Sequence, residues 1–351
     1  MKHTFYLLAL LLGLNSLYGQ NNFEYWQQHV DYEMDVKIDV NTFNYGGTQK
    51  LIYTNNSPDD LGRVFYHLFY NAFQPGSEMD VRSLTIADAD SRVEDRISKL
   101  KKEDFGFLNV VSLTQNSVPL EYTVAGTVLE VQLNTPIKSG ESALFEMTFE
   151  GQIPPVIRRA GKNSKEGVAL SMAQWYPKMA EYDFEGWHAD PYIGREFHGV
   201  WGDFDVKLTL DKSYTVGGTG YLQNPTEIGH GYGTKETKNK TDFLTWHFVA
   251  PNVHDFTWAA DPKFVHDPLQ VPDGPLLHFL YKKSLKREFK KRWKDLQEPT
   301  SEIMQYYSNN VGKYPYEQYS VIQGGDGGME YGMCTLITGE RSFESLVGVT
   351  A

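Results

Sequence analysis

Strict alternation of apolar and polar residues is the feature that most constrains how this chain folds. In its first stretch, Tyr32, Met34 and Val36 alternate with Glu33 and Asp35. The same two-residue period runs through four segments, which are residues 32–40, 129–133, 145–149 and 204–210. Because successive side chains of a strand point to opposite faces, each segment predicts a strand with one buried and one wetted face. We therefore predict a mainly β N-terminal domain built on an antiparallel sheet.

Turn signals and a proline-rich stretch divide the chain further. The expected turns lie at Gly46-Gly47, residues 138–140, Gly217-Gly218 and Asn224-Pro225, because these residue types bound strands. No helical period appears before about residue 280. Residues 261–275 contain four prolines and predict a linker or a domain boundary. A short strand is predicted directly afterwards, at residues 276–281.

Helical spacing appears only in the last quarter of the chain. The apolar residues from Leu285 to Trp293 recur at this spacing and predict an amphipathic helix that ends before Pro299. We interpret the lysines and arginines around them as a solvated face. A second helix is predicted at residues 301–309, with Thr300 as its N-cap.

The N-terminus predicts export. Lys2 and His3 precede an apolar run at residues 5–14, which has the length of a signal core and is too short to span a membrane. We predict a signal peptide at residues 1–19, against the alternative of a buried N-terminal helix, and no transmembrane span after its removal. Cys334 is the single cysteine, so no intrachain disulfide forms. Export without disulfides favours the periplasm or cell envelope of a Gram-negative bacterium, or secretion.

Charge and aromatic content narrow the classes of partner. The formal net charge is −12, which argues against nucleic acid, because phosphate binding needs a basic face. Aromatic residues make up 14% of the chain, which favours β structure or a surface that binds peptide or sugar. An exported glycan-binding β-sandwich is therefore one alternative function.

Residues 323–332 carry the most informative chemistry. Five of these ten residues are glycines, and Glu330 directly follows Gly327-Gly328-Met329. An extended backbone without side chains can pair with a peptide as an added strand, and a carboxylate at its end can bind a free amino terminus. Phosphate binding is disfavoured, because the P-loop pattern is absent and Asp326 and Glu330 would repel an anion. The alternative is a glycine-rich turn with a surface glutamate.

Five segments resemble one family in the expected order. Residues 327–331 resemble the Gly-x-Met-Glu-Asn motif of the zinc aminopeptidase family, which includes the alanyl aminopeptidases and leukotriene hydrolase. The other segments are similar to stretches of the same family, and these are residues 173–177, 199–206, 217–220 and 312–316. The similarity covers essentially all of the mature chain. It implies a saddle-like antiparallel β domain at residues 20–265 and the first α+β part of a thermolysin-like catalytic domain at residues 266–351.

The resemblance also implies roles for individual residues, and hence peptides with a free N-terminus as partners. Glu330 matches the glutamate that binds the substrate's α-amine, and Gln174 matches a glutamine that lines the same subsite. Gly327, Gly328 and Met329 match the backbone strip that pairs with the substrate. Two positions depart from the family: Tyr331 replaces the usual Asn, and Tyr176 stands where many relatives have a second amine-binding acid.

Zinc is the cofactor that the resemblance implies, bound by an H-E-x-x-H helix and a downstream Glu. None of the ten histidines forms this motif, and only 21 residues follow Glu330. We therefore expect the catalytic and metal residues after Ala351, in which case the chain is a fragment that binds no catalytic zinc. We interpret His188, near Asp190, as a structural histidine. The alternative function is a non-catalytic peptide-binding or scaffold member of the same fold.

Overall fold

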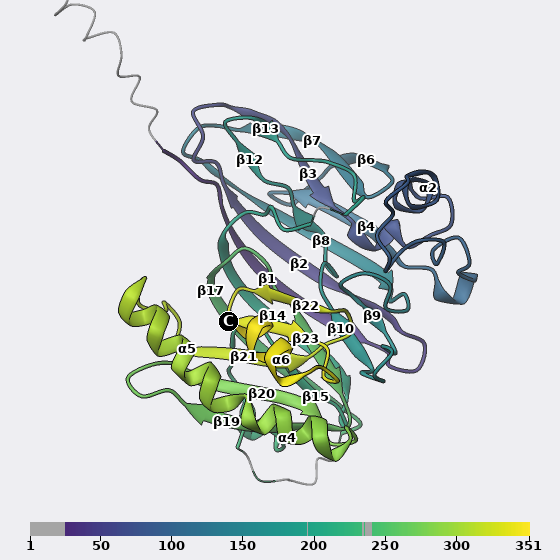
Figure 1. Ribbon diagram of the computed structural model, residues 1–351. Helices are drawn as coiled ribbons and strands as arrows, with labels where there is room; N and C mark the ends of the chain where they lie inside the picture. Colours follow the sequence, from purple (N-terminus) through teal and green to yellow (C-terminus); the bar gives the residue numbers. More distant parts are fainter. Residues whose placement is uncertain (1–24, 195, 234, 236–240) are drawn as a thin grey trace, which may run out of the picture.

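The computed structural model describes residues 25–194, 196–233, 235 and 241–351 (Figure 1). The predicted signal peptide lies outside these residues. Within the described part of the chain, no helix is both long enough and apolar enough to cross a membrane.

A large, twisted, eight-stranded sheet forms the centre of the molecule (Figure 1). Its strand order is β16 (Tyr221–Leu222), β17 (Phe243–Val253), β14 (Gly202–Asp211), β1 (His29–Ile38), β2 (Asn44–Thr54), β8 (Ser142–Gln152), β4 (Phe107–Gln115) and β5 (Val118–Pro119). The alternating segments at 32–40, 145–149 and 204–210 lie in or overlap β1, β8 and β14, which confirms those predictions. All neighbours pair antiparallel except β1 and β14, which are parallel.

Smaller sheets cover the large sheet. One consists of β11 (Lys178–Met179), β3 (Leu61–His67), β7 (Val128–Ile137) and β6 (Glu121–Ala125), and β7 confirms the strand predicted at 129–133. Another consists of β15 (Thr215–Gly218), β18 (Trp258–Asp261), β10 (Leu170–Met172) and β9 (Gly161–Lys162). A separate hairpin joins β12 (Tyr182–Asp183) to β13 (Gly186–Trp187). Between the sheets lies a core in which Trp175, Trp246 and Trp258 are fully buried.

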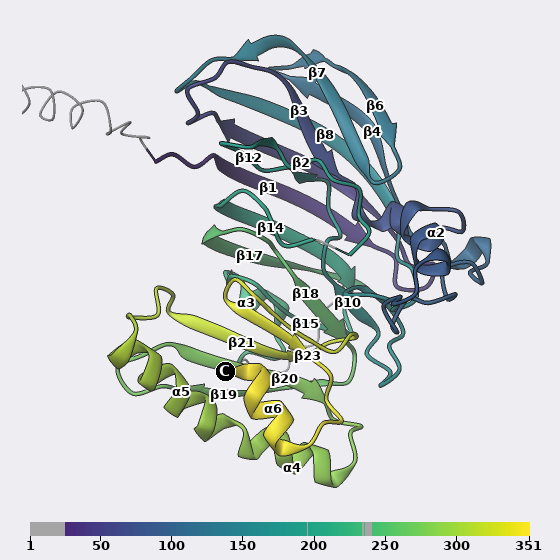
Figure 2. The same cartoon turned by 45° about the horizontal axis from the view of Figure 1, so that its top comes forward.

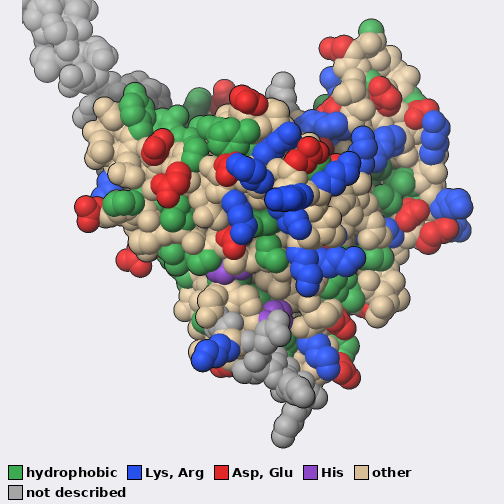
Figure 3. All heavy atoms as spheres, turned by 60° about the horizontal axis from the view of Figure 1, so that its bottom comes forward, with side chains coloured by type: hydrophobic (Ala, Val, Ile, Leu, Met, Phe, Trp, Pro, Cys, Tyr) green, Lys and Arg blue, Asp and Glu red, His purple; other side chains and the backbone are tan. Residues whose placement is uncertain are grey.

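The last quarter of the chain forms a five-stranded sheet with helices on one side (Figure 2). The strand order is β19 (Phe264–Gln270), β20 (Leu276–Lys282), β21 (Gln318–Gln323), β23 (Cys334–Ile337) and β22 (Gly328–Tyr331). The helices are α4 (Arg287–Asp295), α5 (Gln297–Asn310) and α6 (Phe343–Thr350). A second core lies between them and the sheet, around Trp293, Phe279 and Leu346. Lys and Arg side chains gather on the face turned forward in Figure 3, and the sequence of α4 contains five Lys and Arg residues.

Two turn predictions and the linker interpretation are wrong. Gly46-Gly47 lie inside β2, where a Cβ on Gly47 would stand 2.1 Å from the Asp35 carbonyl oxygen. Gly217-Gly218 lie inside β15. These glycines allow neighbouring segments of backbone to approach closely. The sequence alone does not distinguish a glycine needed for such packing from a glycine in a turn. Residues 264–270 are not a linker, because β19 is an edge strand and tolerates Pro268, whose missing N–H is not needed there.

The helix predictions need smaller corrections. Helices do occur before residue 280: α2 (Glu78–Thr85), α3 (Pro225–Ile228) and the 3₁₀ turns η1 (Phe69–Ala72) and η2 (Lys102–Asp104). The amphipathic helix is confirmed as α4. The next helix begins at Gln297 rather than after Thr300, because Pro299 lies in its first turn, where a missing N–H costs nothing. Thr300 is therefore no cap, and its hydroxyl donates to the Leu296 carbonyl.

The membership of the sheets changes between Asp261 in β18 and Phe264 in β19. The first hydrophobic core nevertheless continues beyond this point and includes Leu280 and Ile322. The domain boundary at residue 265 therefore stays a prediction.

Candidate functional site

The glycine-rich segment leads into an edge strand. Residues 324–327 connect β21 to β22, and β22 is the last strand of its sheet, paired only with β23. An edge strand presents a row of backbone N–H and C=O groups without strand partners. A peptide in extended conformation can add to such an edge. The segment therefore has the backbone arrangement that the peptide-strip interpretation requires.

Glu330 is the acidic residue of β22, and its side chain is free. It is exposed, and it makes no hydrogen bond or ion pair to any residue that the structure describes. Opposite it in the register stands Thr335 of β23. A free carboxylate on an edge strand is available for a cation, such as the ammonium group of a peptide.

Asp326, the other acidic residue of the segment, is committed to the protein. Its carboxylate lies 3.1 Å from Nη1 of Arg92 and accepts a hydrogen bond of 2.7 Å from the backbone N–H of Arg159. Only 7% of the side chain is exposed. Asp326 thus fixes the glycine-rich loop to the β domain, which leaves Glu330 as the acid that can receive a ligand.

Further charges extend this contact into a network. Arg92 also pairs with Asp90 at 2.7 Å, and Arg158 contacts the same carboxylate. Arg159 Nε lies 2.8 Å from the fully buried carboxylate of Glu196. The hydrogen bond from Arg92 lowers the pKa of Asp90 to about 2 and outweighs the opposing effect of burial. These residues come from chain segments far apart in sequence, and we define them, together with Asp326, as the charge network.

The glycines of the segment serve its own packing as well. A Cβ on Gly328 would lie 2.3 Å from Cγ1 of Val349 in α6. A Cβ on Gly324 would lie 2.9 Å from Cβ of Leu336, and a Cβ on Gly325 would lie 2.8 Å from Cγ2 of Val156. Gly327 differs, because its φ of +56° favours glycine while its surroundings are open. The fold itself therefore requires residues without side chains in this segment. Access of a ligand to the backbone is a further consequence.

The two departures from the family motif have structural partners. Tyr331 is buried, and its ring meets the edge of Phe197 at 5.9 Å between centroids. Burial raises the pKa of its phenol well above the usual range. The hydroxyl of Tyr176 donates to the buried carboxylate of Asp255, at 3.0 Å, which also pairs with Lys178 at 3.1 Å. Both tyrosines therefore stabilise the core, and Tyr331 is available to a ligand only through its backbone.

Gln174 is buried with an unpaired amide. Its side chain is 2% exposed, its φ is +51°, and Nε2 has no hydrogen-bond partner among the described residues. Burying such a donor is unfavourable unless it finds an acceptor. Three residues earlier, the Ser171 hydroxyl accepts a hydrogen bond from the Gly325 amide at 3.0 Å. The strand that leads to Gln174 therefore touches the glycine-rich loop.

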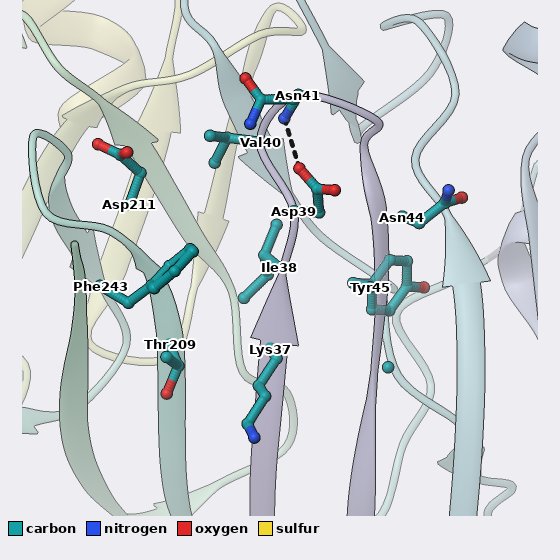
Figure 4. A pocket seen from close by; sticks show the side chains of 11 residues that line it. Lys37, Ile38, Asp39, Val40, Asn41, Asn44, Tyr45, Thr209, Asp211 and Phe243 are labelled. Carbon is teal, nitrogen blue, oxygen red and sulfur yellow. Dashed lines mark hydrogen bonds between the residues drawn. The ribbon is translucent and has the colours of Figure 1, made fainter.

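A cavity of about 680 Å³ lies elsewhere, at one end of the large sheet (Figure 4). It is lined by the β1–β2 turn and by β14 and β17 residues, including Phe243 and Asp211. Its carboxylate Asp39 is engaged by the backbone of Asn41 at 2.8 Å. Because the polar groups of the turn bond to each other, they do not converge on a ligand in this cavity. The cavity also shares no lining residue with β22.

Comparison with known proteins gives a result at the level of structure. No protein-family profile and no curated sequence matches the chain. An M1 zinc metallopeptidase from Deinococcus radiodurans has a TM-score of 0.56 at 14% identity, over 93% of this chain and 62% of that chain. A mutant of that enzyme, bound to a Tyr-Ser-Ala substrate, has a TM-score of 0.53 at 13% identity, over 91% and 63%. The chain has the fold of the M1 zinc metallopeptidases.

The resemblance predicted from the motifs is thus confirmed for the fold. The mainly β fold class is confirmed as well, and the division into a β domain and part of a catalytic domain stays a prediction. A two-domain M1 zinc metallopeptidase mutant bound to L-arginine also matches, with a TM-score of 0.55 at 14% identity, over 92% of this chain and 63% of that one. This chain therefore spans less than two thirds of the M1 structures that it matches. At such identity the comparison shows the fold and leaves activity and substrate to be proposed.

This sequence contains no H-E-x-x-H motif, which is the motif expected to bind a catalytic zinc ion. None of the six predicted site residues carries an imidazole, and Glu330 is their only carboxylate, so they do not fit a zinc ion. We therefore derive no catalytic step through zinc. Of the six predicted site residues, β22 brings Gly328, Met329, Glu330 and Tyr331 together, Gly327 directly precedes them, and Gln174 comes from the β domain.

Proposed function

We propose that this chain supplies the amine-binding subsite of an exported zinc metallopeptidase of the aminopeptidase type. Its substrates in this proposal are peptides with a free N-terminus. One observation carries it: Glu330 stands exposed and unpaired on the edge strand β22, beside a glycine-rich loop that is fixed to the β domain. The M1 fold supports the same function.

In this proposal the substrate adds to β22 as a further strand. Its backbone pairs with the edge of Gly328 and Met329, and its ammonium group reaches the Glu330 carboxylate. The role of Gln174 in lining the same subsite rests on the resemblance alone, because its side chain is buried. Asp326 cannot compete for the ammonium group, because Arg92 and the Arg159 amide already engage it.

The remaining parts of the proposal rest on the sequence and the resemblance. Zinc is the cofactor of the complete protein, and its ligands belong to an H-E-x-x-H helix beyond Ala351. The N-terminal sequence directs the protein to the periplasm or cell envelope of a Gram-negative bacterium, or to secretion.

A binding assay with the full chain tests the subsite. We compare a short fluorescent peptide that has a free N-terminus with the same peptide N-acetylated, using fluorescence anisotropy. An ion pair at a partly exposed site contributes about 1 to 1.5 kcal/mol. We therefore expect the free peptide to bind about five- to tenfold more tightly. Equal affinity for the two peptides would remove the amine-binding role.

A non-catalytic peptide-binding protein of the same fold is the second candidate function, since an exposed Glu330 on β22 can hold a peptide amine without a metal ion. It predicts the same preference for a free N-terminus and differs in turnover. Hydrolysis of an aminoacyl reporter by the complete gene product, abolished by a chelator, favours the peptidase. Binding without turnover favours the second candidate.

A further inference from the structure

Three metal-ligating side chains meet outside the candidate strand. Asp183 ends β12, His188 follows β13 in the same hairpin, and His198 lies in the segment before β14. One ligand atom from each of them lies within 4.8 Å of the other two. Among the described residues, this is the one group of three or more His, Cys, Asp or Glu side chains that meets this criterion.

The distances suit a shared ion. His188 Nε2 lies 2.8 Å from one carboxylate oxygen of Asp183, and His198 Nε2 lies 3.6 Å from the other. Neighbouring ligands of a tetrahedral ion with bonds of about 2.0–2.1 Å stand roughly 3.3 Å apart. The two imidazole rings meet edge to face, with centroids 4.4 Å apart. Small movements of side chains that are not fully buried are enough to bring the three atoms onto one centre.

The site opens into a cavity of about 430 Å³ that is lined with further acidic groups, among them Glu185 and Asp190. His67 lines the same cavity and is 6% exposed. Its Nε2 lies 3.1 Å from the His188 carbonyl oxygen, and its Nδ1 is buried without a partner. With Nε2 as the donor, Nδ1 carries a lone pair that no described group satisfies. His67 therefore holds the His188 backbone in place.

Lys178 is a cation near the three groups, and its pairing with Asp255 at 3.1 Å offsets its charge.

We propose that Asp183, His188 and His198 form a binding site for one divalent transition-metal ion of the zinc type. Two imidazoles and one carboxylate are borderline donors that suit such ions, and they disfavour Ca²⁺ and Mg²⁺, which prefer oxygen ligands. This replaces the interpretation of His188 as a purely structural residue. This site has little signal in the sequence, because His198 is ten residues away from His188 and no H-x-x-x-H spacing is present.

Such an ion joins the hairpin to the segment that precedes β14. That segment also carries Glu196, which pairs with Arg159, and Phe197, which packs on Tyr331. A bound metal therefore fixes the part of the β domain on which β22 rests. This role is independent of whether peptides bind at Glu330.

The test is metal titration of the full chain after dialysis against a chelator. We use Co²⁺ alone, followed by its visible absorption, and Zn²⁺ alone, followed by calorimetry. We expect one ion per chain and, for His198→Ala and His188→Ala, affinity weakened by about tenfold or more, the loss typical of a disturbed metal site. His198 has a side chain that is 58% exposed, so its replacement leaves the fold intact, which circular dichroism checks.

A matched control is His247→Ala. His247 Nε2 also lies 2.8 Å from a carboxylate, that of Asp205, but no third ligand joins this pair within the described part of the chain. Affinity in this variant stays at the wild-type value. The proposal is overturned if the wild-type chain binds no ion stoichiometrically. It is equally overturned if His198→Ala and His188→Ala bind Zn²⁺ as tightly as His247→Ala does.

Discussion

Replacing Asp326 with Asn releases the glycine-rich loop from the β domain. Asp326→Asn keeps the size of the side chain and an oxygen that accepts the hydrogen bond from the Arg159 amide, which is 2.7 Å long in the wild type. It removes the ion pair with Arg92 at 3.1 Å. The change therefore isolates the charge of Asp326 from its shape.

The size of the effect follows from burial and from the remaining partners. Opposite charges about 4 Å apart attract by about 4 kcal/mol at an effective dielectric constant near 20. Arg92 is 35% exposed and keeps its contact with Asp90 at 2.7 Å, so solvent and the second carboxylate reduce the loss. We expect about 1–2 kcal/mol, which corresponds to roughly 5- to 30-fold more frequent opening of the loop.

Hydrogen exchange of the backbone amides measures this opening directly. In Asp326→Asn we expect residues 324–330 to exchange roughly 5- to 30-fold faster, while β1 and β14 keep their protection. Asp273→Asn, in an exposed turn of the last third of the chain, is the matched control and should leave exchange unchanged. Unchanged exchange at residues 324–330 in Asp326→Asn would refute the anchoring role of the charge network.

Two further predictions concern stability. Gly328→Ala places a Cβ 2.3 Å from Cγ1 of Val349 and should lower the free energy of unfolding in urea by about 1–3 kcal/mol. Adding Val349→Ala to this variant should recover most of the loss. A Gly328→Ala variant with unchanged stability would contradict the packing argument. Burial lowers the pKa of His67 to about 4 and that of His278 to about 3, from 6.5. Because the unfolded chain accepts these protons more readily, stability falls as pH drops from about 6.5 toward 4, by up to about 1.4 kcal/mol per pH unit for each histidine. Equal urea midpoints at pH 7 and pH 5 would contradict this.

The strands of the β domain were predictable because their signal is local. Alternation in residues 204–210 needs no knowledge of the partner strand, and β14 (Gly202–Asp211) contains it. A glycine in the sequence does not by itself show whether it lies in a turn or in a closely packed strand. Gly47 in β2 and Gly328 in β22 are both required by close neighbours that are distant in sequence, namely the Asp35 backbone and Val349.

The residues that surround the candidate site could not be predicted in the same way. Asp326 and Arg92 are separated by 234 positions, and neither belongs to a motif. Their contact exists only because the topology brings the loop after β21 against the β domain. Glu330 could be proposed from the sequence for the opposite reason, since the motif that carries it is contiguous. The cluster of Asp183, His188 and His198 lies between these cases: its members are close in sequence, but their spacing follows no ligand pattern.

The most direct test of the central claim measures the coupling between the Glu330 carboxylate and the peptide amine. The affinities of the free and the N-acetylated peptide are determined for the wild type and for Glu330→Gln, with Glu302→Gln in the solvent-facing part of α5 as the control. We predict that the preference for the free amine, about five- to tenfold in the wild type and in Glu302→Gln, falls to about one in Glu330→Gln. A preference that persists in Glu330→Gln would place the amine at another acid and contradict the account.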